Sequence, residues 1–217
     1  MTQRPLPPSA SVAEPREGDR LFAPSAARNA GPIADLLADV APPRGRALEI
    51  ASGTGQHVVT FAARLPGLTW QPTEPDAARR ASIDAHARDA GHANILAARP
   101  LDACTPGWAA AHGGQDLIVL CNLLHLVPMD EALALLDEVP LALASGGRFV
   151  VYGPFRRAGR LTSDGDARFD AELRAADPRI GYKEIDAVRD RLTAGGLTLV
   201  ETREMPANNL ALVAKRP

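Results

Sequence analysis

A turn with two glycines, within residues 46–57, constrains the fold of this chain more than any other feature. Residues 47–51 form a short apolar run interrupted by one carboxylate, and the turn follows at Gly53 and Gly55. From Val58 onward, apolar side chains recur at helical spacing. A strand, a glycine turn and a helix in this order predict a ligand site, because glycine has no Cβ and the first N–H groups of a helix are free. An ordinary tight turn between a strand and a helix is the alternative.

Two details separate the nucleotide-type interpretations of this turn. A dinucleotide site favours G-x-G-x-x-G, whose third glycine lets the helix pack closely on the strand, and this chain has Val58 at that position. A carboxylate inside the strand, here Glu49, followed by Gly-x-Gly resembles the first motif of class I S-adenosylmethionine-dependent methyltransferases. The resemblance implies that Glu49 orients the turn and the amino-acid end of the cofactor. The other cofactor contacts that it implies here are Ser52, Gly53, Thr54, Gly55 and His57.

The composition indicates a single globular α/β domain. A chain of 217 residues can bury a sizeable core, and 46% hydrophobic with 23% charged residues is ordinary for a globular protein. The formal net charge of −2 gives no basic field, so neither nucleic acid nor a membrane surface is an expected partner. Cys104 and Cys121 form no C-x-x-C pair, and we find neither a transmembrane run nor a signal-peptide core. We therefore expect a reduced, cytoplasmic protein, and the oligomeric state stays open.

The N-terminal stretch differs from the rest of the chain. Residues 1–20 carry prolines at positions 5, 7, 8 and 15, and we expect a flexible arm there, ordered at most as a lid over a site. One domain then spans residues 21–217. Strands are expected at 47–51, 68–74, 94–98, 115–121, 148–152, 197–205 and 210–215, and helices at 25–40, 58–64, 76–90, 130–143, 166–176 and 184–194.

This alternation of strands and helices predicts an α/β fold of the Rossmann-like, class I methyltransferase type. We expect a seven-stranded, mostly parallel sheet with helices on both faces and an antiparallel strand from the C-terminal hairpin. Residues 117–121 are an unbroken apolar run, which is typical of a central parallel strand. The cofactor would lie across the carboxyl ends of the first, second and fourth strands.

Acidic residues end the second and third predicted strands. Glu74 follows Gly53 by 21 residues, and a carboxylate there accepts hydrogen bonds from a ribose diol; an acid at the start of the next helix is the alternative. In the class I family an acidic residue after strand three reaches the adenine amino group, so the resemblance implies Asp102 and its neighbour Ala103. An Asx turn is the alternative for Asp102. The predicted cofactor set is completed by Arg28 and Asn122.

Short motifs along the chain narrow the resemblance further. They lie at 27–29, 32–33, 51–57, 70–72, 122–125, 152–155, 169–174 and 205–209. Among them, Ala-Ser-Gly-x-Gly-Gln-His and Met-Pro-Ala-Asn-Asn are specific when found together. With these motifs the chain resembles the family called methyltransferase-like twenty-six and its bacterial relatives. That family implies the fold and the cofactor, S-adenosyl-L-methionine, and supplies no substrate.

The candidate acceptor site draws on residues that are far apart in the sequence. In the class I architecture the turn after strand four faces the cofactor's methyl group, which makes His125 a candidate base, since a neutral imidazole suits proton removal near neutral pH. Packing against the next helix is the alternative for His125, and hairpin-turn chemistry is the alternative for the two asparagines at 208 and 209. Tyr152 is the second candidate catalytic residue. The predicted acceptor contacts are Asn29, His125, Met129, Tyr152, Phe155, Asn208 and Asn209.

The function favoured by these features is methyl transfer from S-adenosyl-L-methionine to oxygen or nitrogen of a small-molecule acceptor. Methyl transfer is an in-line displacement, so alignment of the two reactants carries much of the rate. Cys121 and Asn122 stand where a metal-dependent enzyme would place carboxylates, and no metal is expected. An NAD-linked oxidoreductase and a non-catalytic, methyltransferase-like protein that binds a partner are the alternatives.

Overall fold

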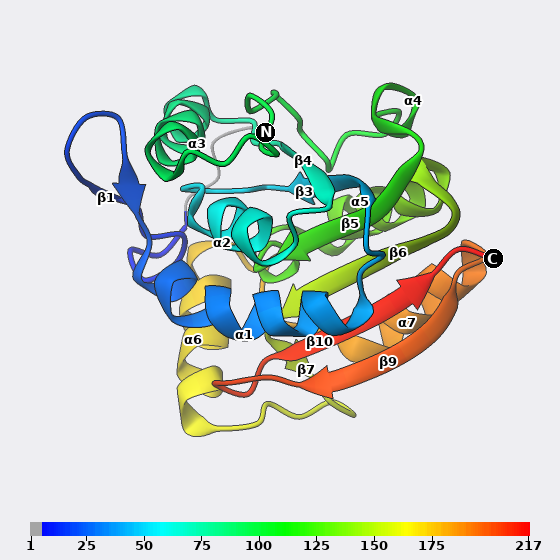
Figure 1. The fold of residues 1–217 in the computed structure, drawn as a ribbon. Helices are drawn as coiled ribbons and strands as arrows, with labels where there is room; N and C mark the ends of the chain where they lie inside the picture. The colour runs from blue at the N-terminus through cyan, green and yellow to red at the C-terminus, as the bar shows by residue number, and fades with distance from the viewer. Residues whose placement is uncertain (1–5) are drawn as a thin grey trace.

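The computed structural model describes residues 6–217, in which a six-stranded sheet lies between two layers of helices (Figure 1). Four strands are parallel to one another and occupy one side of the sheet in the order β4-β3-β5-β6. The antiparallel strand β10 pairs with β6 on one side and with β9 on the other. The strands are β3 (Gly45–Ile50), β4 (Leu68–Pro72), β5 (Gln115–Cys121), β6 (Leu143–Gly153), β9 (Thr198–Glu204) and β10 (Leu210–Lys215).

The prediction of seven strands is wrong, because residues 94–98 do not form a strand. This segment runs beside β4 and makes one isolated bridge to it, between Ile95 and Trp70. Two residues further along β4, Pro72 has no N–H to continue the ladder. The Gln71 side chain takes over by donating to the carbonyl of Ala97 at 2.9 Å. The sequence pattern at 94–98 was compatible with a strand, but its neighbour lacks the donor that a regular pairing needs.

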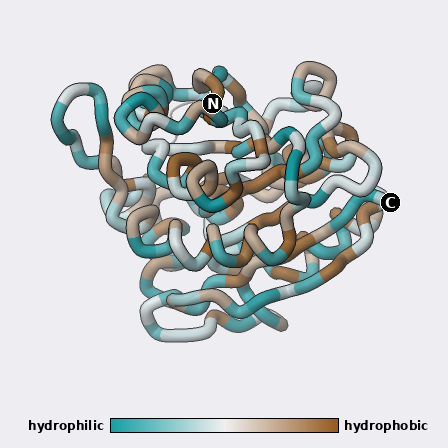
Figure 2. Tube along the Cα trace, in the orientation of Figure 1, coloured by the Kyte–Doolittle hydropathy of each residue, from teal (hydrophilic) through white to brown (hydrophobic). Residues whose placement is uncertain are grey.

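Helices cover both faces of the sheet. Successive side chains of a strand point to opposite faces; Leu48 and Ile50 accordingly join one core cluster and Ala47 joins the other. In Figure 2 the apolar residues concentrate in these central strands. One face is covered by α1 (Pro24–Val40), α2 (Gln56–Arg64) and α3 (Ala77–Ala90), and the other by α4 (Ala109–His112), α5 (Met129–Ala142) and α7 (Ile185–Ala194).

A long connection after β6 builds a third, smaller cluster beside the sheet. It contains the strand pair β7 (Phe155–Arg156) and β8 (Lys183–Glu184) and, between them, α6 (Asp164–Ala176). Helix α6 begins at the Ser163 cap, whose hydroxyl accepts from the Asp166 N–H at 3.2 Å. Leu173, Ile180 and Tyr182 pack here with Leu126 of the short 3-10 turn η1 (Leu124–Leu126).

Residues 6–23, which we call the N-terminal segment, cross from α6 to α3. The Ser9 hydroxyl donates to Glu172 of α6 at 2.6 Å, and the Arg79 guanidinium of α3 donates to the Ser11 carbonyl at 2.9 Å. Beyond these contacts the segment forms a small hairpin of β1 (Glu14–Pro15) and β2 (Leu21–Phe22). Residues 1–5 of the predicted arm lie outside the described residues, and the arm's flexibility stays a prediction.

No helix within residues 6–217 is long and apolar enough to cross a membrane.

Candidate functional site

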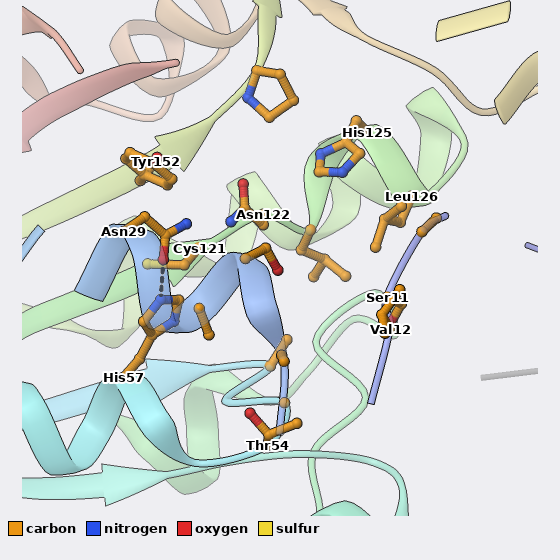
Figure 3. Close-up of a pocket in the computed structure, with 18 of the residues that line it drawn as sticks. Ser11, Val12, Asn29, Thr54, His57, Cys121, Asn122, His125, Leu126 and Tyr152 are labelled. Carbon is orange, nitrogen blue, oxygen red and sulfur yellow. Dashed lines mark hydrogen bonds between the residues drawn. The ribbon is translucent and has the colours of Figure 1, made fainter. Parts of the chain in front are cut away.

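A cavity of about 820 Å³ opens at the carboxyl ends of β3, β4, β5 and β6 (Figure 3). This is the edge at which open α/β sheets hold their ligands. Ala51, directly after β3, and Asn122, directly after β5, both line the cavity and both have left-handed backbone angles, with φ of 54° and 56°. Such conformations are uncommon for residues other than glycine and concentrate at functional sites. The chain therefore turns sharply at this edge and presents its backbone to the cavity.

The two glycines of the turn serve different purposes. Gly53 lines the cavity with φ of 60°, and a Cβ there would meet nothing closer than an Arg79 side-chain nitrogen at 3.7 Å. Gly55 has φ of 94°, and a Cβ there would lie 2.7 Å from the Cα of Ile83 in α3. Gly53 thus exposes backbone to a ligand, whereas Gly55 lets α2 and α3 pack closely and stands outside the cavity lining.

Glu74 lies just past the end of β4 and faces the cavity as a fixed acceptor. One carboxylate oxygen accepts from the Gly53 N–H at 3.0 Å, and the other accepts from the Asp76 N–H at 3.3 Å. Burial raises the pKa of this carboxyl, while the two backbone N–H groups and the nearby Arg79 act in the opposite direction. Each carboxylate oxygen has a second lone pair, so the group can still accept from hydroxyl groups of a ligand.

Glu49 is a buried carboxylate without a hydrogen-bond partner. It stands in β3 on the face covered by α1 and α2, its side chain is 1% exposed, and neither oxygen is hydrogen-bonded within the described residues. Burial raises its pKa to about 8, against the opposing effect of the nearby Ser52 side chain. Burial first, and the charge of Glu49 second, raise the pKa of the Cys121 thiol, which lines the cavity. Because a buried acceptor normally has a partner, this group calls for a donor or a cation from a ligand.

A polar cluster of Asn29, His57, Tyr152 and Asn209 lies on the same side of the sheet. His57 Nε2 is 2.7 Å from Asn29 Oδ1, the contact drawn as a dashed line in Figure 3, and the imidazole stacks on Phe61 with 5.5 Å between ring centres. Burial lowers the pKa of His57 to about 4. Burial also raises the pKa of Tyr152 to about 12, against the opposing effect of Asn29 and Asn209. Both rings are therefore neutral at pH 7.

His125 lies across the cavity from this cluster, in η1 (Figure 3). Its ring meets Phe169 at 5.8 Å and Tyr182 at 6.1 Å between ring centres, both edge to face. Burial first and the charge of Lys183 second lower the pKa of His125 to about 3, although Asp170 acts the other way. His125 thus lines the cavity as a neutral ring and packs against aromatic neighbours at the same time.

The structure brings most of the predicted site residues together. They come from the glycine turn, from α1 and from the ends of β4, β5 and β6. The predicted residues that line the cavity are Arg28, Asn29, Ser52, Gly53, Thr54, His57, Glu74, Asn122, His125, Tyr152 and Asn209.

Four of the predicted cofactor contacts lie outside the cavity lining, three of them for reasons of local structure. Gly55 packs on Ile83, as described above. Asp102 Oδ1 accepts from the Cys104 N–H at 3.1 Å, which is an Asx turn, and the Ala103 carbonyl accepts from the Trp108 indole at 3.0 Å. Glu49, a fourth, lies beneath the lining rather than in it.

Three of the predicted acceptor contacts also lie outside the lining. Met129 is 37% exposed at the start of α5, and Phe155 is buried in the main core. Asn208, with φ of 61°, donates to the Asp166 carboxylate at 3.1 Å instead of facing the cavity. Only Asn209 of the asparagine pair lines it.

Sequence reasoning named none of a group of individual lining residues, although it allowed that residues 1–20 could lie over a site. Phe169 stands within a motif of the suspected family, and that signal could have identified it. The proline-rich N-terminal stretch suggested at most a lid over a site, and nothing in it pointed to individual residues, because their contacts depend on how the segment crosses the sheet edge. The missed residues include Leu6, Ser9, Ala10, Ser11, Val12, Arg79, Phe169 and Tyr182.

Among residues 6–217, no group of three or more His, Cys, Asp or Glu side chains is placed to hold a metal ion.

Comparison with known proteins identifies both a family and a fold. A family model described as a protein of unknown function, DUF938, matches residues 20–216. Similar solved structures include an O-methyltransferase family protein from Burkholderia thailandensis, with 16% identity and a TM-score of 0.75. They also include a putative O-methyltransferase from Nostoc punctiforme, with 21% identity and a TM-score of 0.76. A third is CalO1, a methyltransferase in calicheamicin biosynthesis in its SAH-bound form, with 18% identity and a TM-score of 0.69.

These matches establish a methyltransferase-like α/β fold. They cover 88%, 88% and 89% of this chain but only 57%, 56% and 54% of the three solved chains, in the order given. The chain therefore spans little more than half the length of the proteins that it resembles.

Proposed function

The chain belongs to the DUF938 family of proteins of unknown function, and we propose that it is an S-adenosylmethionine-dependent methyltransferase that acts on a small molecule. The observation that carries this proposal is the cavity at the carboxyl ends of the parallel strands, where the open Gly53 turn and the fixed carboxylate of Glu74 meet at a 3.0 Å hydrogen bond. The methyltransferase-like fold supports it, as does S-adenosylhomocysteine in the similar structure of CalO1.

The residues around the turn fit the chemistry of this cofactor. When bound, S-adenosylmethionine supplies an electrophilic methyl group on a sulfonium centre. Glu74 accepts from the ribose hydroxyls, and the backbone at Gly53 leaves room for the chain of the amino acid. Glu49, which has no partner of its own within the described residues, accepts from the α-ammonium group. Arg28, which is exposed on α1 at the cavity, balances the α-carboxylate.

On the acceptor side, the protein aligns an oxygen or nitrogen atom and helps to remove its proton. His125 is neutral and lines the cavity, so it accepts the hydrogen bond of the acceptor's O–H or N–H and takes its proton as the methyl group arrives. Tyr152 and Asn29 keep the acceptor in place from the opposite side. Because an imidazole with so low a pKa is a weak base, alignment contributes more to the rate than proton transfer.

We also propose, from the motifs at 51–57 and 205–209, that the chain is related to the methyltransferase-like twenty-six family and its bacterial relatives.

Calorimetry with S-adenosylhomocysteine and with NAD tests the cofactor assignment. We expect binding of the first and none of the second, because Val58 is fully buried where a dinucleotide site has its third glycine. Glu74→Ala should weaken S-adenosylhomocysteine binding by about 1.5–3 kcal/mol, the usual size for a hydrogen bond to a charged group. Asp35→Ala, an exposed acid on α1, is the matched control and should bind as the wild type does. Binding of NAD alone would overturn the proposal.

Turnover distinguishes an enzyme from a methyltransferase-like binding protein. S-adenosylmethionine with an isotopically labelled methyl group is incubated with the protein and a metabolite extract, and the labelled products are identified by mass spectrometry. Glu74→Ala should lose the labelled product. Cofactor binding with no labelled product in any fraction would favour the non-catalytic protein.

A further inference from the structure

The cavity changes character from one end to the other. The end of β4 and the start of α3 contribute the charged lining residues Glu74, Asp76 and Arg79. The opposite end, which we call the apolar end, lies against η1, α6 and the start of the N-terminal segment. The uncharged side chains that line it are Leu6, Ala10, Leu126, Val127, Phe169 and Tyr182, and all but Val127 belong to one apolar cluster.

Two buried charges of opposite sign, Lys183 and Asp170, lie behind the apolar end and do not line the cavity. Lys183 is buried and donates to the carbonyls of Val127 at 2.7 Å and Gly181 at 3.0 Å. Asp170 accepts from the Tyr182 N–H at 2.6 Å and from the Arg174 guanidinium at 2.9 Å. The charges of Lys183 and Asp170 act on His125 in opposite directions, and Arg79, a lining cation, is held by the carbonyl and hydroxyl of Ser11. A charged acceptor at the apolar end would have no charged lining side chain to contact there, and burying an unpaired charge is strongly unfavourable.

Three rings form an aromatic wall at the apolar end. His125, Phe169 and Tyr182 meet pairwise edge to face, with ring centres 5.8–6.2 Å apart and interplanar angles of 62–72°. Such packing fixes the rings and presents aromatic surface to a flat partner. In Figure 3, Leu126 stands next to His125 on this side of the cavity, facing Ser11 and Val12 of the N-terminal segment.

We propose that the methyl acceptor is a small, neutral, flat aromatic molecule, whose ring lies against Phe169 and Leu126 and whose hydroxyl or amino group faces His125. This rests on the proposed function, because it assigns the acceptor end of the same cavity. A space of about 820 Å³ that takes both cofactor and acceptor leaves room only for a small second molecule.

Two probes with the same ring system and different charge test the proposal. 2-Naphthol is neutral at pH 7 and 2-naphthoate is an anion, and their affinities are measured by calorimetry with S-adenosylhomocysteine present. We expect 2-naphthol to bind about tenfold more tightly or better, because the side chains that line the apolar end are uncharged. Phe169→Ala and Leu126→Ala should each weaken 2-naphthol binding about tenfold and leave S-adenosylhomocysteine binding unchanged. Leu141→Ala, which is 64% exposed on α5, is the control.

The outcomes separate this proposal from the proposed function. Equal or tighter binding of 2-naphthoate would overturn it, and loss of that binding in Arg28→Ala would identify the counter-charge. Phe169→Leu keeps the apolar volume but removes the ring, and it replaces Phe169→Ala in the experiment if the alanine variant does not fold. An unchanged affinity of Phe169→Leu for 2-naphthol would also overturn the proposal. If S-adenosylhomocysteine does not bind but 2-naphthol is still preferred, the methyltransferase function fails and the neutral aromatic site stands.

Discussion

His57 Nε2 lies 2.7 Å from Asn29 Oδ1, a contact that joins the helix of the glycine turn to the first helix of the domain. Burial lowers the pKa of His57 to about 4, so the ring is neutral at pH 7. Since Asn29 Oδ1 can only accept, the proton is on Nε2. The bond fixes the orientation of the Asn29 amide and leaves its NH₂ group to face other partners.

The first prediction concerns His57 and acid stability. The unfolded pKa is 6.5 and the folded pKa about 4, so between these values the unfolded chain binds more protons and stability falls as the pH falls. The loss contributed by His57 should be on the order of 3 kcal/mol when complete. His57→Gln should remove this part of the slope, as measured by urea unfolding at several pH values from 7 to 4. His92→Gln, after α3, is the control. A variant that keeps the wild-type slope would contradict a neutral, buried His57.

The second prediction concerns Glu49 and has the opposite sign. Its folded pKa of about 8 is above its unfolded value of 4.5, so the folded state holds the proton more tightly. The tighter proton binding by Glu49 in the folded state stabilises the protein fully below about pH 4.5, and this contribution is lost as the pH rises through 8. Glu49→Gln, which is always neutral, should become more stable relative to the wild type as the pH rises from 5 to 8.5, in the absence of ligand.

The same variant tests the role of Glu49 toward the cofactor. Glu49→Gln should bind S-adenosylhomocysteine more weakly, by about 1.5–3 kcal/mol, because the α-ammonium loses its charged acceptor. If the stability difference between Glu49→Gln and the wild type does not vary with pH, the pKa of Glu49 is not raised by burial. If the variant binds S-adenosylhomocysteine as tightly as the wild type, Glu49 does not pair with the ligand.

The third prediction separates packing from binding in the glycine turn. Gly55→Ala places a Cβ 2.7 Å from the Ile83 Cα and adds left-handed strain at φ of 94°. Gly91→Ala, at φ of 67°, carries strain alone, because a Cβ there meets nothing within 4 Å. Both should lose about 1–2 kcal/mol from strain, and Gly55→Ala about 1–3 kcal/mol more from the clash. Thermal unfolding of the two variants gives the difference, and equal losses would contradict the close contact of α2 and α3.

The fourth prediction concerns His125. If it takes the acceptor's proton, His125→Ala should lower turnover by about 10²–10⁴-fold and leave cofactor affinity nearly unchanged. The folded His125 has a pKa of about 3, so the loss of rate caused by its protonation should appear only near pH 3. The pH–rate profiles of the wild type and the variant should therefore run parallel between pH 6 and 8. If the pKa of His125 were unperturbed, the wild-type rate would instead fall as the pH drops through about 6.5. Full turnover in the variant would assign His125 to packing against Phe169 and Tyr182.

Local patterns in the sequence were sufficient to predict the parts of the molecule that depend on them. The glycine turn after β3, the apolar run of β5 and the carboxylate of Glu74 lie where their spacing predicted. The parallel strands then had to meet at their carboxyl ends, which is why distant residues such as Asn29 and Tyr152 could be assigned to one site.

What the sequence could not predict depends on neighbours across the fold. The strand expected at 94–98 fails because of Pro72, a residue on the partner strand. The purpose of Gly55 depends on Ile83, which is 28 residues away, and an isolated motif cannot show it. The N-terminal segment lines the cavity and is held by Arg79 and Glu172, whereas its proline content indicated a flexible arm, ordered at most as a lid over a site.

The missing N–H of Pro72 also bears on how the sheet meets other molecules. A free strand edge is a template on which another chain can pair. At the β4 edge, the segment at 94–99 donates to the carbonyls of Trp70 and Pro72 and accepts from the Trp70 N–H, while Pro72 has no N–H. No continuous row of donors therefore faces solvent at this edge. At the other edge, β9 pairs with β10 alone within the described residues and exposes Leu199 and Val200. For the six-stranded sheet, self-association by strand pairing is therefore blocked at β4 and left to β9, where Glu201 and Arg203 would have to be matched in charge.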